Sequence, residues 1–121
     1  MAQHQPQAPS TQALRPTIDW AGIDDVLLDM DGTLLDLRYD NDFWLEHLPQ
    51  RYAQRQGIPC IEAEQIIQRL VRDAAHTIQF YCLDHWSERL GLDVAAANEE
   101  LAHLIALRPG VPEFLEALAH V

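Results

Sequence analysis

The chain has 121 residues, of which 48% are hydrophobic and 22% are charged, and its formal net charge is −11. This composition predicts one modest soluble domain, since no apolar run approaches the roughly 18 residues that a membrane span requires. The strong negative charge argues against a nucleic-acid partner, because binding to a phosphate backbone needs a basic patch.

The N-terminal part of the chain divides into a polar stretch and a short apolar run. Residues 1–17 are rich in Gln, Pro and Ala without an apolar period, so we expect a disordered tail. They lack the pattern of a secretory signal, which makes the cytoplasm the expected location. The three apolar residues 26–28 predict a strand buried on both faces, as in a parallel sheet, and Asp-Gly-Thr at 31–33 ends it.

Helical patterns dominate the rest of the chain. Asn41 or Asp40 can cap a first helix that stops at Gly57, and Pro59 suits the first turn of the next helix. Apolar residues then recur at three- and four-residue steps, and the sequence Arg-Pro-Gly at 108–110 interrupts the pattern. The expected helices cover about 41–56, 59–78, 83–90, 94–105 and 112–120.

A single strand leaves its backbone hydrogen-bonding groups without partners, so one strand does not make a sheet. We therefore expect a second strand to follow the last helix and complete a β-α-β unit. The chain stops at Val121, where that strand would begin. The expected fold class is α/β, with the core incomplete in this chain, which would be the front part of a longer protein.

Two carboxylates, Asp29 and Asp31, stand at the end of the expected strand. The simplest interpretation is a polar turn, because Asp, Gly and Thr are common turn residues. A calcium loop counted from Asp29 would need Gly at its sixth position and a bidentate acid, usually Glu, at its twelfth. Those positions hold Leu34 and Asp40, and a strand rather than a helix precedes them, so a calcium loop is disfavoured.

A third interpretation uses both acids in phosphoryl chemistry. One carboxylate can attack a phosphoryl group, and a second can protonate the leaving oxygen and later activate water. Residues i and i+2 of a strand share a face, so Asp29 and Asp31 could reach one ligand, and Gly32 would let the backbone approach a phosphate. Two acids that face a phosphate dianion need a cation, and Mg²⁺ is the expected one.

The residues at this strand end resemble a known motif. L-L-D-M-D-G-T-L is similar to motif I, D-x-D-G-T-[LV], of the haloacid dehalogenase-like hydrolase superfamily. The helical insertion resembles the superfamily's α-helical cap, and R-P-G-V-P-E-F-L resembles the return to its Rossmann-like parallel-sheet core. D-N-x-F-W and the run Y-C-L-D-x-W-S-E-x-L-G-L-D from Tyr81 to Asp93 further resemble the bacterial GMP/IMP nucleotidase branch. The resemblance implies core at 18–38, cap at 39–108 and core again at 109–121.

The resemblance implies a role for each motif residue. Asp29 would be the nucleophile and a Mg²⁺ ligand, and Asp31 the general acid/base, with its backbone carbonyl as a second metal ligand. Gly32 and Thr33 would contact the substrate phosphate or, for Thr33, support the loop. The implied activity is phosphomonoester hydrolysis through an aspartyl-phosphate, with a purine 5'-mononucleotide as the favoured substrate.

Substrate choice would lie in the cap. Asn41, Phe43 and Trp44 follow motif I closely and are candidate substrate contacts, while Tyr81 and Trp86 could stack on a purine. The alternative is that these aromatic residues fill a core. The superfamily also needs a phosphate-binding Ser or Thr, a Lys or Arg and a later acidic pair, and the chain contains no Lys, so we expect it to be inactive alone.

Other functions stay open at this stage. The nearest is another capped phosphatase acting on phosphoglycolate or a sugar phosphate. A second is a non-catalytic binding protein with a relic motif I, and a third is a short interaction module built on the helices. Cys60 and Cys82 are expected to be reduced, partly buried thiols, because their spacing fits no metal or redox motif. The sequence does not set an oligomeric state.

Overall fold

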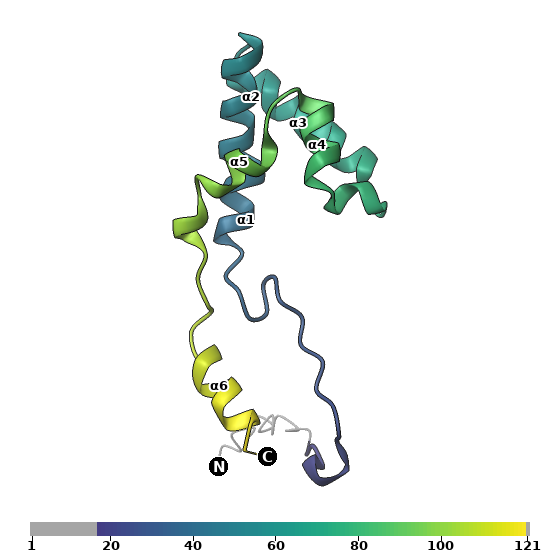
Figure 1. The fold of residues 1–121 in the computed structure, drawn as a ribbon, viewed down its shortest axis with the longest axis vertical. Coiled ribbons are helices and arrows are strands. Elements are labelled where there is room, and N and C mark those ends of the chain that lie inside the picture. The colour runs from purple at the N-terminus through teal and green to yellow at the C-terminus, as the bar shows by residue number, and fades with distance from the viewer. Residues whose placement is uncertain (1–16, 121) are drawn as a thin grey trace, which may run out of the picture.

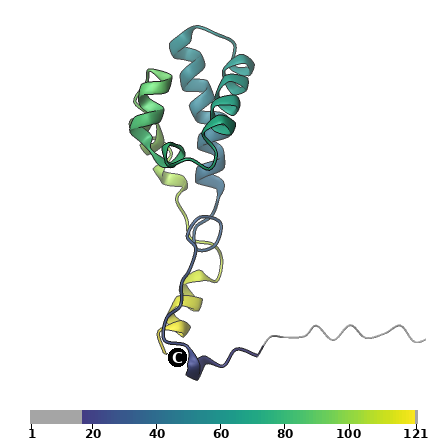
Figure 2. The ribbon, with the colours of Figure 1, turned by 90° about the vertical axis from the view of Figure 1, so that its right-hand side faces the viewer.

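The computed structural model describes residues 17–120, and the tail expected at 1–17 lies almost wholly outside them. Figure 1 shows an elongated molecule with most helices at one end and α6 at the other. The helical block, residues 38–104, contains α1 (Arg38–Asp42), α2 (Leu48–Gln56), α3 (Cys60–Ala74), α4 (Leu83–Leu90) and α5 (Val94–Glu99). Two linkers connect it to α6 (Val111–Leu118) and to the extended N-terminal segment (Figure 2).

The predicted α/β fold class is wrong for the described residues, which are helical and contain no strand or sheet. Two isolated bridges, Asp31 with Leu35 and Leu35 with Leu107, are the β-type pairings in this part of the chain. The run 26–28, expected to be a buried strand, is irregular, and Leu27 is 95% exposed. The physical reason is that no segment between residues 17 and 120 pairs with its backbone.

The first helix starts earlier than predicted and has a different cap. α1 begins at Arg38, so Asp40 and Asn41 lie inside it rather than at its start. The N-cap is Leu37, which makes no side-chain capping hydrogen bond, and the Asp36 carboxylate before it accepts a hydrogen bond from the Arg38 amide at 2.7 Å. The expected stop at Gly57 is confirmed, because Gly57 takes a left-handed conformation (φ 68°) and its amide donates to the Ala53 carbonyl.

A π-helical segment, Phe43–His47, joins α1 to α2. Pro49 stands in the first turn of α2 and has no amide to donate to the carbonyl four residues earlier. The wider turn that precedes it removes the clash that a proline ring causes in a regular helix. This segment begins with Phe43, whose side chain is completely buried.

Two further helices are shorter than their apolar patterns predict. α3 ends at Ala74, since His76 adopts a left-handed backbone conformation (φ 66°), and Ile78 lies exposed in a following 3-10 turn, Ile78–Tyr81. α5 stops at Glu99 and a second 3-10 turn, Ala102–Leu104, follows. In the part of the chain that the structure covers, no helix is long and apolar enough to cross a membrane.

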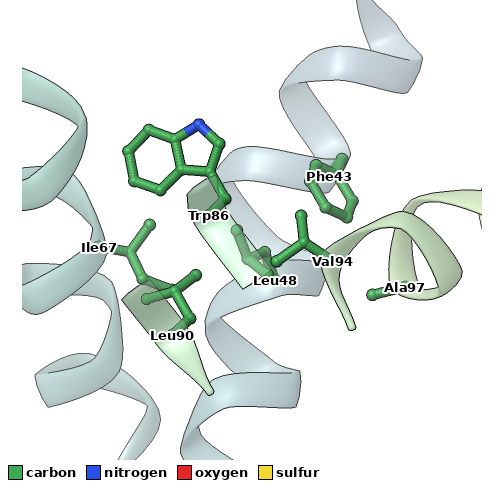
Figure 3. Packing of buried hydrophobic residues seen from close by; sticks show 7 residues of the cluster. All are labelled: Phe43, Leu48, Ile67, Trp86, Leu90, Val94 and Ala97. Carbon is green, nitrogen blue, oxygen red and sulfur yellow. The ribbon is translucent and has the colours of Figure 1, made fainter. Parts of the chain in front are cut away.

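The hydrophobic core lies inside the helical block. Trp86 of α4 is 1% exposed, and its indole Nε1 donates to the Phe80 carbonyl at 2.9 Å. The core therefore depends on contacts between helices and is separate from the linkers. Figure 3 shows the seven side chains of this cluster: Phe43, Leu48, Ile67, Trp86, Leu90, Val94 and Ala97.

An ionic cluster connects the end of α5 to α2 and to the π-helical segment. The Glu100 carboxylate, just after α5, contacts Arg51 of α2 and lies 2.7 Å from His47 Nε2. Hydrogen bonds from Arg51 and then from His47 lower the pKa of Glu100 below its usual value of 4.5. The ionised form of Glu100 is therefore favoured by folding.

Replacing Trp86 with Phe should destabilise the helical block by about 2 kcal/mol, because the smaller ring leaves a void and the Phe80 carbonyl loses its donor. Urea unfolding followed by circular dichroism measures the loss. Trp20→Phe is the matched control, since Trp20 is 40% exposed and outside this core. Equal midpoints for the two variants would contradict the packing described here.

The Glu100 cluster predicts a pH dependence. Because the pKa of Glu100 is lowered in the folded state, its stabilising contribution is present above pH 4.5 and is lost as the pH falls through the folded pKa. Glu100→Gln should therefore lower the urea midpoint at pH 7 and have little effect at pH 3. The exposed Glu88→Gln serves as control and should change neither value.

Candidate functional site

The motif turn, residues 29–35, reverses the chain within a few residues. The Leu34 and Leu35 amides both donate to the Met30 carbonyl at 2.9 Å, and the Gly32 amide donates to the Leu35 carbonyl at 2.9 Å. Gly32 has a positive φ of 77°, and a β-carbon there would lie 3.0 Å from Leu37 Cδ1. A side chain at this position would therefore strain the backbone and displace the side chain of Leu37.

Asp29 and Asp31 are both exposed on this turn, so solvent or a ligand can reach them. The Thr33 hydroxyl donates to Asp29 Oδ2 at 3.1 Å. This bond orients the Asp29 carboxylate and leaves its other oxygen for a ligand. Thr33 thus has the supporting contact that was one of its two expected roles.

Two linkers hold the motif turn against the helical block. The outgoing linker, residues 34–37, begins with the last two residues of the motif turn and leads into α1. The return linker, residues 105–108, leads from the helical block towards α6. Leu35 pairs with Leu107 in an antiparallel bridge, the Asp36 amide donates to the Ala106 carbonyl at 2.8 Å, and the Arg108 amide donates to the Leu34 carbonyl at 2.9 Å. Segments that are 70 or more residues apart in the sequence therefore meet beside the two acids.

Arg108 also reaches the motif turn with its side chain, where the guanidinium Nη1 donates to the Gly32 carbonyl. Residues 108–110 were expected to interrupt the helical pattern and to begin the return to the core, but this contact of the Arg108 side chain was not predicted. The signal that could have found it is a lone Arg placed directly before Pro-Gly, at the point where the chain returns to the motif.

A small cavity of about 210 Å³ opens between the linkers beside Asp31. Partial burial and then the charge of Asp31 raise the pKa of Asp40 above its ordinary value. Asp40 had been interpreted as a cap or a solvated acid, and its proximity to Asp31 was not foreseen. The residues that line the cavity are Asp31, Leu35, Asp36, Leu37, Tyr39, Asp40, Ile105 and Ala106.

The candidate substrate contacts of the helical block lie in different environments. Asn41 is exposed on α1, whereas Phe43 is fully buried in the core. Trp44 is half-buried, and its ring packs edge-on against Trp86 with centroids 5.1 Å apart. Tyr81 is 82% exposed on a 3-10 turn. Core packing, the alternative role, is the one that Phe43, Trp44 and Trp86 show in this arrangement.

The two acids have the oxygen donors that suit a hard divalent ion, but two carboxylates do not by themselves complete a coordination shell. Mg²⁺ binds through one or two carboxylates, with phosphate oxygens and waters completing its shell. Asp29 and Asp31 supply such donors, while residues 17–120 contain no group of three or more His, Cys, Asp or Glu placed to hold a metal. Cys60 and Cys82 are free thiols, and both are exposed rather than partly buried as expected.

Comparison with known proteins shows that the chain is similar to bacterial nucleotidases, which confirms the resemblance seen in the motif and in the run from Tyr81 to Asp93. The GMP/IMP nucleotidase YrfG of Escherichia coli strain K12 and that of Shigella flexneri are each 46% identical to it over 101 residues. The match covers 84% of this chain and 46% of each relative, so the chain spans about half the length of the curated relatives that it matches. No protein-family profile and no solved structure matches it.

Gly32→Ala should loosen the motif turn, because a non-glycine residue at this φ costs about 1–2 kcal/mol and the new methyl group meets Leu37. We expect the Leu34 and Leu35 amides to exchange with solvent about tenfold faster or more, as measured by NMR. Gly57→Ala is the matched control, with a similar φ of 68° and nothing within 4 Å of the new group. Unchanged exchange in Gly32→Ala would contradict the geometry.

Proposed function

We propose that this chain carries the nucleophile and the acid/base of a Mg²⁺-dependent phosphomonoester hydrolase that acts on a purine 5'-mononucleotide. The observation that carries the proposal is the motif turn itself, which presents two exposed carboxylates in a chain 46% identical to GMP/IMP nucleotidases. In this proposal the helical block is the cap that covers the substrate.

The reaction would use the two acids in sequence. In the first step an Asp29 oxygen bonds to phosphorus, the bond between phosphorus and the ester oxygen breaks, and Asp31 gives its proton to that leaving oxygen. In the second step Asp31 takes a proton from water, the water oxygen bonds to phosphorus and the Asp29–phosphorus bond breaks. Both acids then return to their starting states.

The motif turn supports these roles through its hydrogen bonds. The Thr33 hydroxyl donates to Asp29 Oδ2, which leaves the other carboxylate oxygen free to attack phosphorus. Gly32 has a positive φ of 77°, so the chain reverses directly after the two acids. A fixed nucleophile is worth more than a mobile one, because the entropy of orientation is lost before the reaction begins.

A cation is needed because the chain has a net charge of −11 and the substrate is a dianion. We assign the Asp29 carboxylate and the Asp31 backbone carbonyl as ligands of Mg²⁺. When bound, Mg²⁺ offsets the repulsion between the acids and the phosphate. Because the chain contains no Lys, we also expect residues 1–121 in isolation to show little turnover.

The coding sequence is first read beyond the codon for Val121, and the protein that it encodes is expressed. The test then measures phosphate release from GMP and IMP by this protein. Asp29→Asn should reduce kcat by at least ~10⁴-fold, and Asp31→Asn by about 10²- to 10⁴-fold. Chelation of Mg²⁺ should abolish turnover, and added Mg²⁺ should restore it. Exposed Asp25→Asn is the matched control and should retain activity.

Three results would overturn the proposal. Full activity in Asp29→Asn would show that Asp29 is not the nucleophile. A preference for phosphoglycolate or a sugar phosphate over GMP and IMP would favour a different capped phosphatase. Binding of a phosphate analogue without turnover would support a non-catalytic protein instead.

A further inference from the structure

Arg108 contacts the motif turn through both its backbone and its side chain. Its amide donates to the Leu34 carbonyl at 2.9 Å, and its guanidinium donates to the Gly32 carbonyl. Arg108 takes part in none of the three ion pairs found between residues 17 and 120. Its side chain is therefore held by the turn rather than by a carboxylate.

The Gly32 carbonyl belongs to the same rigid peptide unit as the Thr33 amide, because peptide groups are planar. Fixing this carbonyl fixes the orientation of the unit and hence the position of Thr33. The Thr33 hydroxyl in turn donates to Asp29 Oδ2 at 3.1 Å. A continuous set of contacts thus leads from Arg108 through one peptide to the carboxylate of Asp29.

This set of contacts matters because the segment before the turn has little other support. Residues 26–28 pair with no strand in the described chain, and Met30 is exposed. The contacts that fix the turn relative to the helical block come from the linkers, and Arg108 supplies two of them. A displacement of the return linker would therefore change the position of the Asp29 carboxylate.

We propose that Arg108 is a positioning residue for Asp29, acting through the Gly32–Thr33 peptide and the Thr33 hydroxyl. The inference rests on the proposed function, in which Asp29 attacks phosphorus. A guanidinium suits this role, since its planar group donates in a fixed direction and stays charged at all relevant pH values. Arg108 itself needs no contact with the substrate.

A double-mutant cycle in the expressed protein tests this role, with GMP as substrate. Arg108→Ala and Thr33→Val should each lower kcat about tenfold with KM changed less than about twofold, because both misplace the nucleophile after binding. The double variant should be no slower than the worse single variant, since both changes break the same set of contacts. Arg108→Lys should recover part of the loss, because an ammonium group can also donate to the Gly32 carbonyl.

Arg38→Ala is the matched control. Arg38 is an exposed residue whose side chain is 69% accessible and pairs with Asp42. This variant should keep its kcat, and its effect should add to that of Thr33→Val. Additive effects of Arg108→Ala and Thr33→Val, or a loss confined to KM, would overturn the positioning role.

A second readout does not need turnover. The ¹³C resonance of the Asp29 carboxyl group should shift in Arg108→Ala and in Thr33→Val, and stay in place in Arg38→Ala. If the wild-type protein releases no phosphate, the proposed function fails, but the resonance still reports whether Arg108 positions Asp29. An unmoved resonance in Arg108→Ala would overturn the inference even in an active enzyme.

Discussion

The pairing of the two linkers is the constraint on which the rest of the structure depends. Backbone hydrogen bonds from Asp36 to Ala106 and from Arg108 to Leu34 bring the start and the end of the helical block together. Without them the motif turn would have no fixed relation to the helices, because the segment before it pairs with no strand in the described residues. A few hydrogen bonds between the linkers thus position the motif turn, while the apolar contacts of the core lie inside the helical block.

The core and the site are built by different forces. Packing of Trp86, Ile67 and their neighbours stabilises the helical block through burial of apolar surface, which is not directional. The motif turn instead depends on directional hydrogen bonds around Gly32 and Thr33. Stability of the block therefore does not by itself ensure a correctly oriented Asp29.

Local rules predicted the features that depend on neighbouring residues. Gly57 ends α2 as expected, and its amide donates to the Ala53 carbonyl at 2.9 Å. The turn expected at Asp-Gly-Thr, residues 31–33, is also present. These features depend on only a few neighbouring residues, because the conformational preference of a glycine or a turn residue is local.

Features that depend on distant contacts were not predictable in the same way. The strand expected at 26–28 fails because strand formation needs a partner, which local sequence does not supply. The contact of Arg108 with Gly32 joins residues 76 positions apart, and no periodicity reveals it. Core packing was one of the two roles expected for Phe43, and which role applied depended on its packing against distant helices.

The bridge between Leu35 and Leu107 has a consequence for how the molecule could change over time. Because the helical block leaves and rejoins the motif turn at adjacent points, its own size and content do not set the distance between the linkers. A block with longer, shorter or rearranged helices would fit the same two attachment points. Evolution could therefore replace the helical block and retain the two acids, because the bridge keeps the two attachment points together.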